Sequence, residues 1–68
     1  MKSFYKRHEI QVNTQPSGTI IFDIFDARKQ HLLAGFSLRN ENEQTVADRM
    51  KERVDQFVLE AQMNSFTN

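Results

Sequence analysis

The stretch GTIIFDIFDARKQHLLAGF, residues 18–36, places five large apolar residues within six positions. Side chains of a β-strand alternate between its two faces, so a strand here points its even-numbered apolar residues one way and Ile21 and Phe25 the other way. A small domain needs only one such face for its core. The sequence therefore predicts a strand that is apolar on both faces, and leaves open what covers the second one. The five residues are Ile20, Ile21, Phe22, Ile24 and Phe25.

Upstream of this strand, the alternation of apolar and polar residues from Tyr5 to Asn13 predicts a half-buried strand. The segment TQPSGT, residues 14–19, has the residues of a type I turn followed by Gly18 in the left-handed conformation. A hairpin closed by this turn places Val12 opposite Phe22. Apolar residues then meet apolar residues across the two strands, which supports the register.

Downstream, DARKQ at residues 26–30 predicts a second hairpin with Lys29 in the left-handed position that glycine prefers. A regular ladder from this turn makes the even-numbered residues of the third strand, Leu32 to Leu38, face the helix. Leu33 then points to the opposite face. The helix-facing set expected from both hairpins is Ile10, Val12, Ile20, Phe22, Ile24, Leu32, Ala34, Phe36 and Leu38.

A long helix is predicted from the polar segment RNENEQ, residues 39–44, to about Asn64. Asn40 with Glu43 has the spacing of a capping box, and Asn42 is a competing cap. The apolar residues that follow recur at spacings of three and four, which indicates one amphipathic face. They are Val46, Met50, Val54, Phe57 and Ala61.

The predicted fold class is α+β: a three-stranded antiparallel β-meander followed by one long C-terminal helix packed on one sheet face. Its 68 residues predict a single domain, with residues 1–3 and 65–68 expected to fray. The chain contains no cysteine, and no apolar run approaches the length of a membrane span. The segment after Met1 lacks the apolar run of a signal peptide. These features favour a soluble cytoplasmic protein.

Chemistry-bearing motifs are scarce, so we expect no enzymatic activity, no cofactor and no metal. His8 and His31 are the only histidines and have no third ligand with suitable spacing. Two glycines, Gly18 and Gly35, cannot form a phosphate-binding loop.

Apolar residues outside the expected core point to a protein–protein interaction module, most simply a homodimer, although strand propensity alone also explains some of them. The first candidate surface is the outer sheet face, with Ile21, Phe25 and Leu33. The second lies along the far side of the helix near its end, with Leu59, Met63 and Phe66.

The alternative is a nucleic-acid-binding accessory protein that uses basic residues near the amino terminus and the hairpin tips. A three-stranded sheet followed by a helix is similar in outline to the arm-binding domains of phage-type integrases, which implies a sheet inserted in the major groove. Glu9 and Asp23 on the expected outer face, and a formal net charge of zero, argue against that mode. The candidate residues are Lys2, Tyr5, Lys6, Arg7, Arg28, Lys29 and Arg39.

Overall fold

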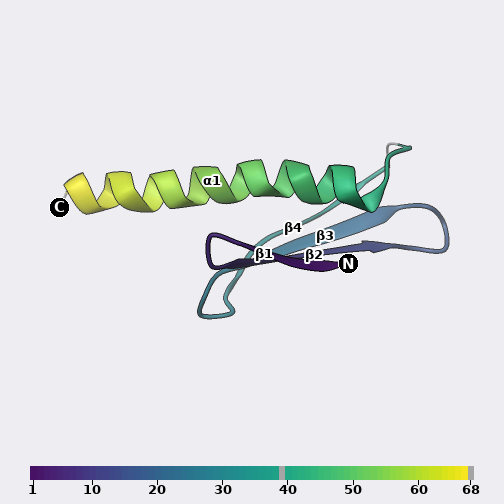
Figure 1. The fold of residues 1–68 in the computed structure, drawn as a ribbon, viewed down its shortest axis with the longest axis horizontal. Helices are drawn as coiled ribbons and strands as arrows, with labels where there is room; N and C mark the ends of the chain where they lie inside the picture. The colour runs from purple at the N-terminus through teal and green to yellow at the C-terminus, as the bar shows by residue number, and fades with distance from the viewer. Residues whose placement is uncertain (39, 68) are drawn as a thin grey trace.

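The computed structural model describes residues 1–38 and 40–67, the last three of these by their backbone. Within them, an antiparallel sheet in the order β1-β2-β3-β4 lies against a single helix (Figure 1). The predicted α+β architecture is therefore confirmed, with one more strand than expected. The elements are β1 (Lys2–Tyr5), β2 (His8–Thr14), β3 (Ile20–Phe25), β4 (His31–Ser37) and α1 (Glu43–Thr67).

The additional strand, β1, arises because the segment expected to be one strand is folded in two at Lys6 and Arg7. Both residues have positive φ, 48° and 66°, as the central positions of a type I′ hairpin turn require. Neither is glycine or asparagine, so the sequence gives no sign of the turn. The Met1 amino group donates a hydrogen bond of 2.8 Å to the Val12 carbonyl. Residues 1–3, expected to fray, thus lie along β2.

The β2–β3 hairpin has the predicted register, with Val12 opposite Phe22 and Gly18 at a φ of 94°. The β3–β4 turn is also as predicted, because Lys29 has a φ of 65° and the Asp26 amide donates to the Gln30 carbonyl at 3.0 Å. The residues of each turn were therefore enough to predict its conformation.

The predicted faces of β4 are wrong because of a β-bulge at its start. Phe25 pairs with His31 but Ile24 pairs with Leu33, which leaves Leu32 as an extra residue. A shift of one residue exchanges the two faces of a strand. Leu33 therefore packs against the core, whereas Phe36 lies outside with 65% of its surface exposed. The expectation that Leu32, Ala34, Phe36 and Leu38 face the helix does not hold, since all four are exposed.

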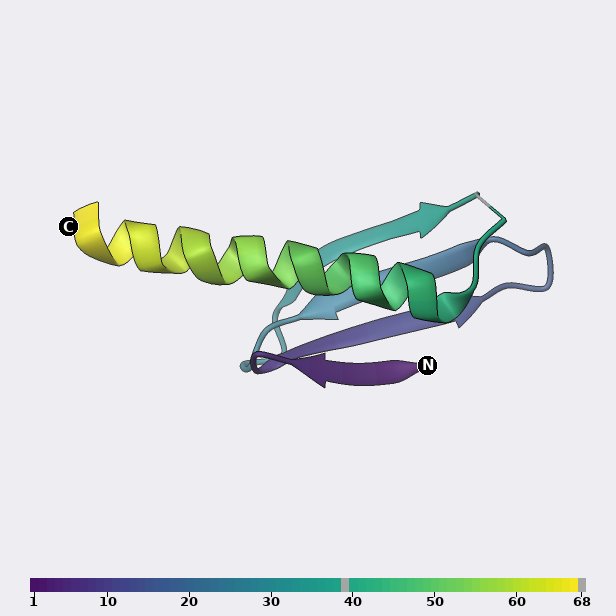
Figure 2. The ribbon, with the colours of Figure 1, turned by 45° about the horizontal axis from the view of Figure 1, so that its top comes forward.

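The core lies between α1 and the inner face of the sheet. α1 packs against β2, β3 and β1. Figure 2 shows β4 along one side of the helix and β1 along the other, with the carboxyl-terminal half of α1 extending past the β1–β2 and β3–β4 turns. Phe57 and Val58 still pack against the core, and we call the part of the helix that follows them, residues 59–67, the overhang. The buried apolar side chains are Ile10, Val12, Ile20, Ile24, Val46, Ala47, Met50 and Val54.

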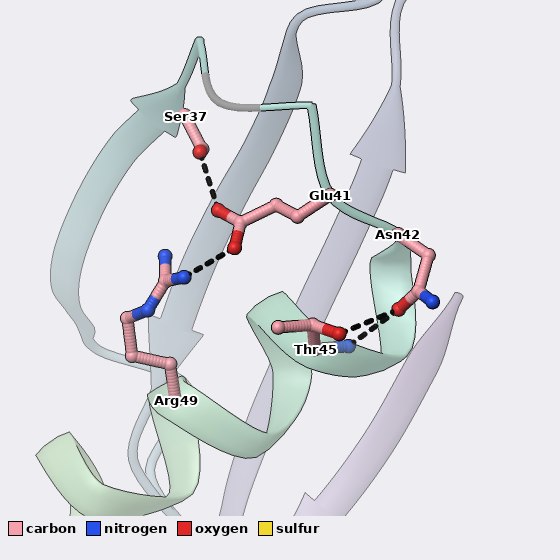
Figure 3. A network of polar contacts seen from close by, with 5 residues as sticks. All are labelled: Ser37, Glu41, Asn42, Thr45 and Arg49. Carbon is pink, nitrogen blue, oxygen red and sulfur yellow. Dashed lines mark hydrogen bonds and ion pairs between the residues drawn. The ribbon is translucent and has the colours of Figure 1, made fainter.

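The amino terminus of α1 is capped by Asn42, one of the two caps that the sequence offers. Its side-chain oxygen accepts hydrogen bonds from the Thr45 amide at 2.8 Å and the Thr45 hydroxyl at 2.9 Å. Just before it, Glu41 accepts from the Ser37 hydroxyl at 2.6 Å and forms an ion pair with Arg49 (Figure 3). These contacts join the end of β4 to the first turns of the helix.

Candidate functional site

The outer face of the sheet, which is the face turned away from α1, carries apolar side chains at its two ends. At the end near the β2–β3 turn, Ile21 is paired with Phe36, and both are exposed, at 37% and 65%. Ile21 thus lies where the sequence places it, but its apolar neighbour is Phe36 in place of Leu33.

The middle of this face is polar. Asp23 stands between Gln11 and Ala34, and its carboxylate is 2.8 Å from Nε2 of His31. The Asp23 carboxylate therefore has a hydrogen-bond partner within the chain. The row of Gln11, Asp23 and Ala34 separates the two apolar ends of the outer face, so Ile21 and Phe25 belong to different surfaces.

At the other end, near the β1–β2 and β3–β4 turns, Phe4, Glu9 and Phe25 form one row across β1, β2 and β3. Phe4 is 70% exposed, and the Phe25 ring stacks on His31 with 4.8 Å between ring centroids. A depression of about 550 Å³ opens here, which we call the hairpin hollow. It is lined by Lys2, Phe4, Arg7, Glu9, Gln11, Phe25, Asp26, Ala27 and Lys29.

β1 and β4 are the two edge strands of the sheet, and the edge formed by β4 is the more apolar candidate for an interface. The sequence from Leu32 to Leu38, LLAGFSL, contains neither a charged residue nor a proline. Natural sheets commonly protect such edges with charges, prolines or a covering element, because unpaired main-chain groups accept another strand. Here β4 lies beside the helix and not beneath it (Figure 2). Among the described residues, β4 pairs with β3 on one side and with no strand on the other.

The second candidate surface of the sequence lies on the overhang. Leu59 and Met63 are exposed there at 56% and 57%, as expected of residues away from the core stripe. The side chain of Phe66 lies outside the described residues. Beneath the overhang is a second depression of about 590 Å³, with Leu32, Phe57 and Val58 among its lining residues.

The residues named for nucleic-acid binding divide into several groups. Lys2, Arg7 and Lys29 line the hairpin hollow, and Arg28 is exposed at the tip of the β3–β4 turn. Tyr5 and Lys6 instead face α1: Tyr5 packs against the core, and Lys6 is 2.6 Å from a carboxylate oxygen of Asp55. Arg39 lies outside the described residues. The structure also adds Phe4, which the sequence analysis did not single out.

Two carboxylates hold the helix to the strands. The hydrogen bond from Lys6 lowers the pKa of Asp55 below its ordinary value of 3.8, and the same contact raises the pKa of Lys6. Glu43 accepts hydrogen bonds from the Thr14 hydroxyl at 2.7 Å and the Thr14 amide at 2.9 Å. These bonds lower the pKa of Glu43 below 4.5. Both groups are structural ties at the surface.

Within residues 1–38 and 40–67, no group of three or more histidine, aspartate and glutamate side chains is placed to hold a metal ion. No helix in the same residues has the length and apolar character needed to cross a membrane. No protein-family model, curated protein or solved structure matches the chain.

Proposed function

We propose that this protein is a small non-enzymatic interaction module that associates with a second copy of itself through the β4 edge and the adjoining outer face. The observation that carries the proposal is an edge strand with exposed apolar side chains and no charge between Leu32 and Leu38. Unprotected edges of this kind pair with other strands.

A second copy fits this edge for reasons of symmetry. Two antiparallel copies of one strand pair about a two-fold axis, so each residue near the axis meets itself or a close neighbour. Identical charges would repel there, and the segment from Leu32 to Leu38 has none. The formal net charge of zero also removes long-range repulsion between copies.

The register that we favour is centred on Gly35. It places Phe36 of each copy opposite Ala34 of the other, which pairs a large side chain with a small one on the outer face. Ile21, which neighbours Phe36 in the ladder, extends this apolar contact. The bulge at Leu32 interrupts the regular edge and limits pairing to Leu33–Ser37.

Sedimentation equilibrium over a range of concentrations tests the proposal with a matched pair of variants. Phe36→Lys and Phe4→Lys make the same change on the same face at similar exposure, 65% and 70%, but on opposite edges of the sheet. The native chain is expected to approach twice its monomer mass of 8.0 kDa. Phe36→Lys should weaken association by about tenfold or more, whereas Phe4→Lys should leave it intact.

A native chain that stays monomeric throughout, or equal losses in the two variants, contradicts the proposal. The overhang is the second candidate surface, and Leu59→Lys separates it from β4. Loss of association in Leu59→Lys with retention in Phe36→Lys would move the interface to the helix.

A further inference from the structure

The hairpin hollow combines features that the proposed self-association does not use. It lies at the other end of the outer face from Phe36. Two hairpin turns, β1–β2 and β3–β4, contribute residues to its rim. The β1–β2 turn supplies Arg7 and the β3–β4 turn supplies Lys29. Its floor comes from β1, β2 and β3.

Two phenyl rings form the apolar part of the hollow. Phe4 and Phe25 lie on strands separated by β2, which puts their backbones about 10 Å apart. Phe4 in particular is 70% exposed, so most of its surface is available to a ligand. One face of the Phe25 ring already stacks on His31, so a flat ring can stack on Phe4 or on the other face of Phe25.

The uncompensated charge of the hollow is positive. Its lining has three basic side chains, Lys2, Arg7 and Lys29, against two acidic ones, Glu9 and Asp26. Glu9 lies 3.9 Å from Lys2, whereas Asp26 accepts hydrogen bonds from the amides of Arg28 and Gln30, which are neutral and do not cancel its charge. The side chains of Arg7 and Lys29 make no ion pair or hydrogen bond among the described residues.

The backbone at both cations is held in a costly conformation. Arg7 and Lys29 have φ values of 66° and 65°, where a non-glycine residue costs roughly 1–2 kcal/mol. Glycine would relieve this cost at either turn but would remove the charge.

We propose that the hairpin hollow binds a nucleotide unit, with the base stacked on Phe4 or Phe25 and the phosphate held by Arg7 and Lys29. Aromatic side chains beside a positively charged rim are the general means by which proteins hold single-stranded nucleic acid. An acidic peptide would satisfy the cations but leave the phenyl faces uncovered. The nucleotide comes either from a single strand or from a free nucleoside phosphate, and the experiment distinguishes these sources.

The test is fluorescence anisotropy of labelled twelve-residue oligouridine and oligothymidine, repeated at increasing salt and with unlabelled uridine monophosphate as competitor. Binding of the oligonucleotides that weakens as salt rises supports a strand as the source. Competition by the monophosphate at concentrations comparable with those of the oligonucleotide supports a free nucleotide in the same hollow. Absence of binding by both ligands at low salt overturns the proposal.

The double variant Arg7→Gly with Lys29→Gly separates folding from binding, because it removes two charges while relieving the backbone. Its melting temperature should equal or exceed that of the native chain, and its log–log salt slope should fall by about 0.7, the value for the single phosphate that both cations hold. Arg28→Gln is the matched control, since Arg28 is in the same turn but does not line the hollow. An equal loss in this control would indicate non-specific charge attraction and contradict the proposal.

Phe4→Ser tests stacking and should weaken binding by about fivefold or more. Phe36→Ser is its control at similar exposure on the other end of the face and should leave nucleotide binding unchanged. Equal binding of polyglutamate and oligonucleotide, or no effect of Phe4→Ser, would assign the hollow to acidic protein segments and overturn the proposal.

Discussion

The Phe22 ring, which lies opposite Gly35 in the β3–β4 ladder, leaves no room for a side chain at position 35. A Cβ atom at Gly35 would lie 2.6 Å from two carbons of this ring, so Gly35→Ala forces the half-buried ring to move. We expect the free energy of unfolding to fall by about 1–3 kcal/mol, as in other overpacked sites. Urea denaturation measures the change.

The same substitution in a Phe22→Leu background supplies the control. Leucine is shorter than the phenyl ring, so adding the methyl group should cost clearly less there, and the double-mutant cycle should show coupling between the two positions. Equal costs in the two backgrounds would mean that Phe22 does not cover Gly35.

At the scale of an element, the bulge at Leu32 determines which side chains of β4 face outward. Because Phe25 pairs with His31 and Ile24 with Leu33, deletion of Leu32 leaves both pairs intact and removes only the extra residue. The deletion variant should therefore fold cooperatively, with an unfolding free energy within about 1–2 kcal/mol of the native value. Circular dichroism during urea titration reports both properties.

Deletion of Ala34 is the matched control, since it shifts the rest of β4 by one residue and exchanges its faces. This variant should be severely destabilised. If instead Leu32 deletion abolished cooperative folding and Ala34 deletion were tolerated, β4 would have the regular register that the sequence alone predicts.

The helix is attached to the strands by carboxylates whose pKa values are lowered, so its attachment depends on pH. The folded-state pKa lies below the unfolded value for Glu43 and Asp55, which means that their stabilisation is present above the ordinary values of 4.5 and 3.8. It is lost as pH falls through the lowered folded-state values. We expect the melting temperature of the native chain to fall in this acid range, and to fall less in a Glu43→Gln, Asp55→Asn double variant. Parallel curves would assign the acid sensitivity to other groups.

At the scale of the whole molecule, the features that could be predicted were those with a local cause. The β2–β3 turn has Gly18 where a left-handed residue is needed, and the spacing of apolar residues marks α1. Features that depend on partners elsewhere were missed. The β1–β2 turn uses Lys6 and Arg7 at positive φ, and the bulge at Leu32 has no turn residue to announce it.

The candidate surfaces show the same division. Ile21, Leu59 and Met63 are exposed because their positions follow from strand alternation and helical periodicity. Leu33 was misplaced, and Phe36 missed, by the single residue of the bulge. Phe4 was missed because its strand was not expected, although a phenylalanine between Lys2 and Arg7 was visible in the sequence.

Amide hydrogen exchange of β4 at low and high protein concentration tests the central claim most directly, because it observes the edge itself. We predict that those amides of Leu33–Ser37 that do not bond to β3 exchange fast in dilute solution and slowly at high concentration, while Phe36→Lys keeps them fast at both. Exchange at these amides that is independent of concentration would contradict pairing of the β4 edge.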